Sequence, residues 1–304
     1  PRREISVYDI NVEMMSFAEK YLHHYFAVDR IGGEWFDMDD ARVMSDVAPI
    51  LVTLQTEMAA RKPDFVQWGQ LKNQVSNGIN LAALPTHTAL HQSYQAAQES
   101  LTLATAQHDI HKANLKTMIG ANDGIENVIT LIEVNRSDSF SKTAFEGLLT
   151  PTQLAQCDET KTAISGSCRV VGGDGLSVLD PALAAQLAAA NAAYTTTPNL
   201  TNLTGTPLPL TQAVKDEHML MLATKRQVKE AEWECLKLKA QLIAALGLND
   251  SIDGIISWSR TTTTSTTFSK KLAQENFETE YNACLTPQQN TVSVKFHEGR
   301  TYNP

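Results

Sequence analysis

The sequence predicts an α+β protein built around a tandem repeat, in which each copy joins a long helix to a small antiparallel sheet. Two observations predict this fold class. Apolar residues at helical spacing run through two long segments, 87–119 and 211–246. A set of residues after each segment also recurs at a spacing of about 127 positions. At 304 residues, the chain is long enough for two or three domains that each bury a core.

The repeat is clearest where each long helix is expected to end. A glycine there predicts a left-handed helix cap, and an Asn-Asp pair and an apolar strand follow it. Further along, Phe-Ser-Lys occurs in both copies at a spacing of 128 instead of 127 positions. A cysteine near the end of each copy returns to the spacing of 127. The matched residues are Leu115, Gly120, Asn122, Asp123, Ile125, Ile129, Phe140-Ser141-Lys142 and Cys157, and then Leu242, Gly247, Asn249, Asp250, Ile252, Ile256, Phe268-Ser269-Lys270 and Cys284.

We expect the sheet of each copy to form within that copy. The strands that follow the glycines, 125–134 and 252–264, would pair with the strands near the end of each copy, 163–171 and 291–297. Between these strands, Asp158-Glu159-Thr160-Lys161 contains a Glu-x-Lys, a spacing that some nucleases use at their metal site. The tripeptide is common by chance, so a loop is the preferred interpretation.

The chain divides into four predicted segments. Residues 1–62 form the first, and 63–172 hold the first repeat module with a lead-in helix. A connector rich in Ala and Thr, 173–207, includes an alanine-rich helix over 181–193. The second repeat module occupies 208–304.

The first segment opens on a predicted strand, 4–10, because EISVYDI alternates apolar and polar side chains. A helix is expected over 13–26, ending before a glycine pair. Trp35 and Phe36 are expected to be core residues.

A further helix should begin at Asp39 or Asp40 and run to about Ala60, with a kink near Pro49.

Composition excludes several classes of protein. No apolar run reaches the roughly 20 residues that span a bilayer, and the N-terminus has no signal-peptide core, so we expect a cytoplasmic protein without membrane contact. The net charge of −9 argues against broad, nonspecific nucleic-acid binding. Residues 208–304 carry 11 basic and 11 acidic side chains, so any polyanion contact is likeliest there. Four cysteines without CxxC spacing are expected to be reduced, buried thiols.

Two groups of side chains on the long helices could carry chemistry. His87 with His91, and His108 with His111, share helix faces and could offer imidazoles to zinc, but a third ligand is not evident. We therefore expect ordinary hydrogen-bonded or exposed histidines.

The second long helix is locally basic, yet glutamates interleave with its cations, which favours an ion-paired face over a phosphate-binding surface. These cations are Lys225, Arg226, Lys229, Lys237 and Lys239, and the glutamates are Glu230, Glu232 and Glu234.

The opening segment resembles a known family. The pattern Ala18-Glu19, Leu22-His23, Phe26, Arg30 and Gly33-Glu34-Trp35-Phe36 is similar to the C-terminal half of the GIY-YIG nuclease domain in its phage branch, over residues 5–36. The resemblance implies that Glu19 binds a single divalent metal, Mg²⁺ or Mn²⁺, that polarises a DNA phosphate. It also implies that His23, one turn further, lies near the same cleft as a possible catalytic residue.

The tyrosine motifs and the arginine of such enzymes have no counterpart before Glu19. The resemblance therefore implies a DNA endonuclease only if an upstream segment supplies them, and the 304 residues alone are expected to be inactive. Both repeat modules, more loosely, resemble the C-terminal tail of YqaJ-type phage recombination exonucleases. Together the resemblances imply a phage-type DNA-metabolism protein, located in the host cytoplasm if phage-encoded.

The alternative interpretation is a non-enzymatic module. The acidic charge, the missing tyrosine motifs and the duplicated module favour a protein-binding or assembly module, which could be virion-associated. Its long helices would contact a protein partner or a second copy of the chain.

Overall fold

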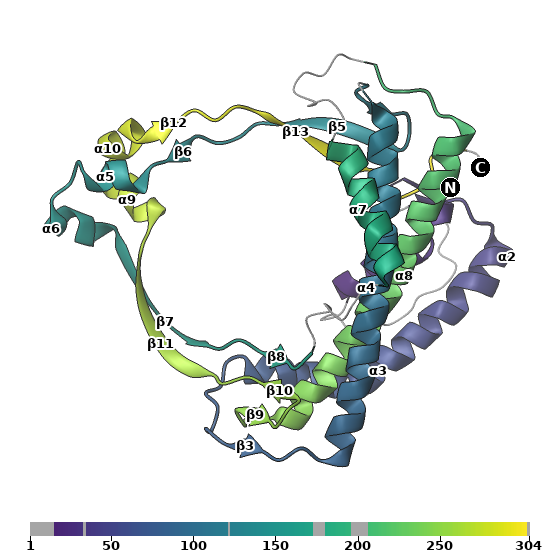
Figure 1. Ribbon diagram of the computed structural model, residues 1–304. Coiled ribbons are helices and arrows are strands. Elements are labelled where there is room, and N and C mark those ends of the chain that lie inside the picture. Colours follow the sequence, from purple (N-terminus) through teal and green to yellow (C-terminus); the bar gives the residue numbers. More distant parts are fainter. Residues whose placement is uncertain (1–14, 33–34, 121, 173–179, 196–205, 303–304) are drawn as a thin grey trace.

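The computed structural model describes five stretches of the chain, and the expected strand at 4–10 and Gly33-Glu34 lie outside them. The protein is mixed α+β, with long helices at one side and thin strand ribbons that arc away to a small helical cluster (Figure 1). The described stretches are 15–32, 35–120, 122–172, 180–195 and 206–302.

Two long helices form the centre of the fold, as the sequence predicts. Helices α4 (Pro85–Ile119) and α8 (Gln212–Leu246) each have 35 residues and are therefore about 50 Å long. They pack antiparallel, because Tyr94 shares a core cluster with Leu246 near one end and Leu115 shares another with Leu222 near the other.

Both long helices end in the same way. Gly120 and Gly247 have φ angles of 58° and 59°, which a residue with a Cβ rarely adopts, so the predicted positive-φ caps are confirmed. Two residues later, Asn122 and Asn249 each donate a 2.8 Å hydrogen bond to a carbonyl in the last turn. The expected cap residues thus satisfy helix carbonyls that would otherwise have no partner.

The expected pairing of strands within each copy is wrong. Strand β5 (Ile129–Val134) pairs with β13 (Thr291–Phe296), and β7 (Asp158–Ser165) pairs with β11 (Thr261–Phe268). The antiparallel helices explain this exchange. Since they end at opposite ends of the pair, each outgoing strand starts where the returning strand of the other segment arrives (Figure 1).

Short strands close the sheets at the ends of the helix pair. At one end, β4 (Gly124–Ile125) pairs with β5. At the other end, a four-stranded sheet has the order β3-β9-β10-β8. Its strands are β3 (Asn80–Leu81), β9 (Ser251–Ile252), β10 (Ile256–Ser257) and β8 (Arg169–Val170).

The far ends of the ribbons meet in a helical cluster. There β6 (Ser139–Phe140) pairs with β12 (Leu285–Thr286), and the rings of Phe140 and Phe268 stack at 6.0 Å. Ser141 donates its main-chain N–H to Cys284, and Ser269 donates to Cys157. The helical elements are α5 (Lys142–Glu146), α6 (Pro151–Leu154), a 3₁₀ turn (Ala155–Cys157), α9 (Lys270–Asn276) and α10 (Glu278–Ala283).

The N-terminal segment packs on α8. Helix α1 (Met15–Tyr25) and a 3₁₀ turn (Ala27–Asp29) lead into a hairpin of β1 (Arg30–Gly32) and β2 (Trp35–Phe36). Contrary to expectation, Trp35 is 54% exposed, because the side chains of this short strand alternate and Phe36 takes the inner position.

The next helix extends further than predicted. Asp39 caps α2 (Asp40–Arg42), and a π-helical segment (Val43–Val47) joins it to α3 (Ala48–Leu71). The π segment lies directly before Pro49, where the sequence predicts a kink. The helix runs past Ala60 to Leu71, whose side chain is buried.

The remaining elements follow the sequence more closely, with one exception. The alanine-rich helix is α7 (Pro181–Thr195), which packs on α4. Residues 158–161 lie in β7 and not in a loop, because their partner strand β11 pairs with all eight residues of β7. All four cysteines are free thiols, and Cys168 is half-buried while the other three are buried. No helix in the described stretches is long and apolar enough to cross a membrane.

Candidate functional site

The structure places Glu19 and His23 one turn apart on α1. Glu19 is exposed, and the ring of the half-buried His23 lies 5.9 Å from that of Phe36. Among the residues that the structure describes, no group of three or more His, Cys, Asp or Glu side chains could hold a metal ion. Glu19, the one ligand that the resemblance implies, is therefore a single exposed carboxylate on α1.

The histidine pairs of the long helices make hydrogen bonds, as preferred from the sequence. His91 Nε2 lies 2.7 Å from the main-chain oxygen of Val171. His108 Nδ1 lies 3.1 Å from the main-chain oxygen of Met221, and His111 Nδ1 lies 2.8 Å from Glu217 Oε1. These imidazoles tie helices and strands together.

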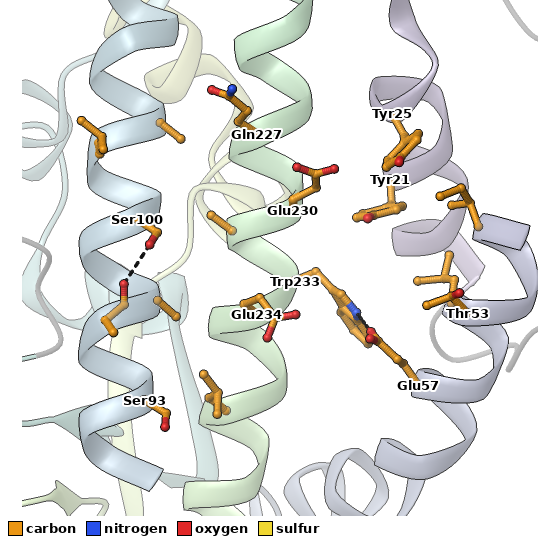
Figure 2. A pocket seen from close by; sticks show the side chains of 18 of the residues that line it. Tyr21, Tyr25, Thr53, Glu57, Ser93, Ser100, Gln227, Glu230, Trp233 and Glu234 are labelled. Atoms are coloured by element: carbon orange, nitrogen blue, oxygen red, sulfur yellow. Dashed lines mark hydrogen bonds between the residues drawn. The ribbon is translucent and has the colours of Figure 1, made fainter. Parts of the chain in front are cut away.

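A groove lies between α1 and α3 on one side and α4 on the other, over α8 (Figure 2). It encloses about 1040 Å³ and contains three carboxylates, which all have cationic partners. Glu57 accepts from Trp233 Nε1 at 2.6 Å and from Lys237 Nζ at 2.9 Å. Glu230 pairs with Arg226, and Glu234 with Lys237. The charges of this groove are therefore balanced by two cations of α8, Arg226 and Lys237.

A second pocket, here called the cationic pocket, has the opposite electrostatic character. It encloses about 660 Å³ where α1, β1, α4 and α8 meet the end of β13. Four cationic side chains line it, and Glu298 is the one carboxylate in its lining. The cations are Arg30, Lys112, Lys225 and Lys295.

Three histidines also line the cationic pocket. Burial, with Lys225 as the next cause, lowers the pKa of His24 to about 4 and that of His108 to about 4. Burial and Lys295 also lower the pKa of His297. The pocket wall is therefore built from neutral imidazoles at neutral pH, held among ammonium and guanidinium groups.

Few carboxylates offset the cations of the pocket. Arg30 lies 3.9 Å from Glu298, and Lys112 lies 3.6 Å from Asp109. For Lys225, no ion pair is found among the described residues, and burial followed by repulsion from Lys229 lowers its pKa. Glu232 and Glu298 attract this ammonium without an ion pair to it, and their attraction does not restore its ordinary pKa.

The sequence positions the pocket wall through a close backbone approach. The main-chain oxygen of Arg30 accepts a hydrogen bond from the N–H of Arg300. A Cβ on Gly299 would lie 2.5 Å from the same oxygen, so this position needs glycine. Gly299 thus lets the chain after β13 lie directly on β1, which brings Lys295 and Arg30 to the same pocket.

Sequence reasoning missed this pocket as a unit. Arg226, Lys229 and Lys237 do form the expected ion pairs with glutamates of α8, which confirms the interpretation of that face. Lys225 and Lys239 form no ion pair among the described residues. Lys239 lies over the ring of Trp68, and the companions of Lys225 come from segments far away in the sequence. The sequence contains one hint of the pocket. Residues 208–304 carry as many basic as acidic side chains, although the whole chain is acidic.

Comparison of the chain with protein-family models, with curated proteins and with solved structures found no match in any of the three.

Proposed function

We propose that the chain is a non-enzymatic assembly module, built from two copies of one unit, that self-associates through an exposed strand. Matching contacts at a constant spacing support the duplication. Leu81 pairs in parallel with Ile252, and Leu208, 127 positions after Leu81, forms a parallel bridge with Ile125. The helix caps and the serine-to-cysteine bonds of the far cluster recur in the same way.

The observation that carries the self-association is the outer edge of β11. This strand, TTTTSTTF, pairs with β7 along one edge, and no described strand pairs with its other edge. Seven of its eight residues are exposed. Proteins usually protect such an edge with charges, proline or a bulge, and β11 has no charged residue and no proline.

A second copy of the chain is the occupant that suits this edge best. Two β11 strands can pair antiparallel about a two-fold axis, so that the same surface is used on both sides. Neither strand would bring a charge to the pairing, whereas β7 carries Asp158, Glu159 and Lys161. A lone two-stranded ribbon is also marginally stable in water, so further strands would stabilise it.

Sedimentation velocity over a wide range of concentrations tests this proposal. We expect the wild-type chain to form a dimer. Thr264→Lys should weaken that dimer at least tenfold, because like charges placed opposite each other between strands repel. The matched control is Thr162→Lys, since Thr162 and Thr264 are cross-strand partners whose hydroxyl oxygens lie 2.9 Å apart.

The control breaks the same hydrogen bond between the two hydroxyls and adds the same charge to the same ribbon, but it places that charge on β7. It should leave the dimer intact. A wild-type chain that stays monomeric, or two substitutions that weaken the dimer equally, would contradict pairing through β11.

The nuclease that the resemblance implies is the competing proposal. It is favoured by the position of α1 and β1, which bring His24 and Arg30 to the cationic pocket. Incubation of plasmid DNA and Mg²⁺ or Mn²⁺ with the longest natural product that contains this chain decides between them. We expect intact plasmid, and cleavage that Glu19→Gln abolishes would replace the assembly proposal with the nuclease.

A further inference from the structure

We propose that the cationic pocket binds a small phosphate-bearing anion. This inference does not depend on self-association. The pocket is lined by residues of the helix pair and the end of β13, and these elements lie away from the β7/β11 ribbon (Figure 1).

The charge of the pocket is the first argument. Arg30, Lys112, Lys225 and Lys295 come from β1, α4, α8 and β13, so the fold gathers cations that are distant in the sequence. The chain as a whole has a net charge of −9, so cations gathered in this way stand out from its acidic background. Like charges repel more strongly in a partly desolvated pocket than in water, and an anion held between them would remove that repulsion.

Unsatisfied polar groups are the second argument. His24 is 7% exposed and lines the pocket, and its Nδ1 has no hydrogen-bond partner among the described residues. Buried polar atoms nearly always have a partner, so this nitrogen points to an absent one. A neutral imidazole can donate one N–H to an anion oxygen. Lys225, which forms no ion pair among the described residues although Glu232 and Glu298 attract it, adds an ammonium group to the same pocket.

The other half of the molecule provides a comparison. At the spacing of 127 residues, Lys225 corresponds to Gln98 and His108 to Cys235. Cys235 is buried, and Gln98 donates to Tyr94 at 3.0 Å. The helix pair thus accommodates neutral side chains at the matching positions. The fold does not require the cation and the imidazole, which indicates that they have another role.

The donors and the volume define the class of ligand. A guanidinium offers a planar pair of N–H donors and an ammonium a compact charge, and phosphate oxygens accept from both. A volume of about 660 Å³ lies within the usual range for small-molecule sites. A phosphate, a diphosphate or a phosphorylated metabolite fits this description.

Titration calorimetry and thermal unfolding of the full chain test the proposal, with pyrophosphate as the probe and sodium chloride at equal ionic strength as the reference. Pyrophosphate should raise the melting temperature, and chloride should not. Lys225→Met keeps the apolar stem but removes the charge. We expect it to weaken pyrophosphate binding at least tenfold while the ligand-free protein stays as stable as the wild type or becomes more stable.

The matched control is Lys271→Met, which removes one charge from the far cluster, where the side chain of Lys271 is 82% exposed. It should bind pyrophosphate as the wild type does. Equal effects of pyrophosphate and chloride, or equal weakening by the two substitutions, would overturn the proposal. A single-stranded oligonucleotide that binds the pocket more tightly than pyrophosphate would overturn it in favour of nucleic acid.

Discussion

His218 Nε2 lies 2.9 Å from the main-chain oxygen of His297, directly after strand β13. His91, 127 positions earlier, makes the same contact with Val171, directly after β8, at 2.7 Å. Each long helix therefore uses one buried imidazole to hold the strand that returns to it. His218 is fully buried and also hydrogen-bonds the hydroxyl of Tyr302 at 2.8 Å.

Replacing His218 with alanine should destabilise the fold. The substitution leaves a buried carbonyl without a donor, so the free energy of unfolding should fall by about 1–3 kcal/mol. Urea unfolding measures this change. Tyr302→Phe keeps the bond to His297 and should cost less, whereas equal losses would contradict the role assigned to the carbonyl.

Gly254 lies in the turn after α8, and Asn127 occupies the matching position in the turn after α4. This match predicts that asparagine can replace Gly254. Gly254 has a φ of 66°, and Asn127, 127 positions earlier, adopts 60°. No described atom lies within 4 Å of a Cβ built on Gly254. Backbone strain is therefore the main cost, and asparagine tolerates this region better than β-branched residues do.

We expect Gly254→Asn to lower the melting temperature by less than Gly254→Val does. The valine variant should lose about 1–2 kcal/mol of unfolding free energy. A thermal melt of both variants is sufficient, and an asparagine variant as unstable as the valine variant would contradict the equivalence of the two turns.

The buried histidines of the cationic pocket predict loss of stability in acid. In the unfolded chain, His24 and His108 take up protons near pH 6.5, but in the folded protein their pKa values are about 4. Between these values the unfolded state binds more protons, so the free energy of unfolding should fall as the pH drops from 6.5 towards 4. Above pH 6.5 both states are neutral and this contribution is constant.

Replacing His24 with Asn and His108 with Gln should flatten that dependence. Denaturant unfolding at several pH values provides the measurement. Identical slopes for the double variant and the wild type between pH 6.5 and pH 4 would show that other groups cause the acid sensitivity.

Arg260 predicts a specific requirement for arginine before β11. Its side chain is 1% exposed and lies over the ring of Trp258 at 4.3 Å. Nε donates to the main-chain oxygen of Gln74 at 3.1 Å, and Nη2 donates to that of Gly247 at 2.9 Å. The guanidinium thus joins the end of α8 to the loop after α3.

Arg260→Lys should lower the free energy of unfolding by about 2 kcal/mol or more, because one ammonium cannot reach both carbonyls in the same geometry. Arg169→Lys, at an exposed position of β8, is the control and should change stability little. A lysine at position 260 that preserves full stability would show that charge alone is sufficient there.

Local pattern predicted the helices well. Apolar spacing gave α4 and α8 nearly to the residue, and the glycines at 120 and 247 marked their ends. Alanine content was sufficient for α7. These features depend on neighbours along the chain, so a single sequence contains the information.

Strand partners and the cationic pocket depend on distant contacts and were not predicted. A threonine-rich strand such as β11 has no apolar face that would select β7 over another partner. Trp35 has an aromatic side chain typical of a core, but its place in a short edge hairpin leaves it exposed. In the sequence, Lys225 cannot be distinguished from Arg226 and Lys229 beside it. Only the structure shows that those two pair with glutamates and that Lys225 does not.

The exchange of strands between the two halves sets an order of events during synthesis. Strand β5 leaves the ribosome more than 150 residues before β13, its partner. At about 5–20 residues per second, β5 waits about 8–30 s with the edge that faces β13 unpaired. The nascent first half is thus exposed to wrong pairings until translation of the second half is complete, and chaperones that shield strands during this interval should raise the yield of folded protein.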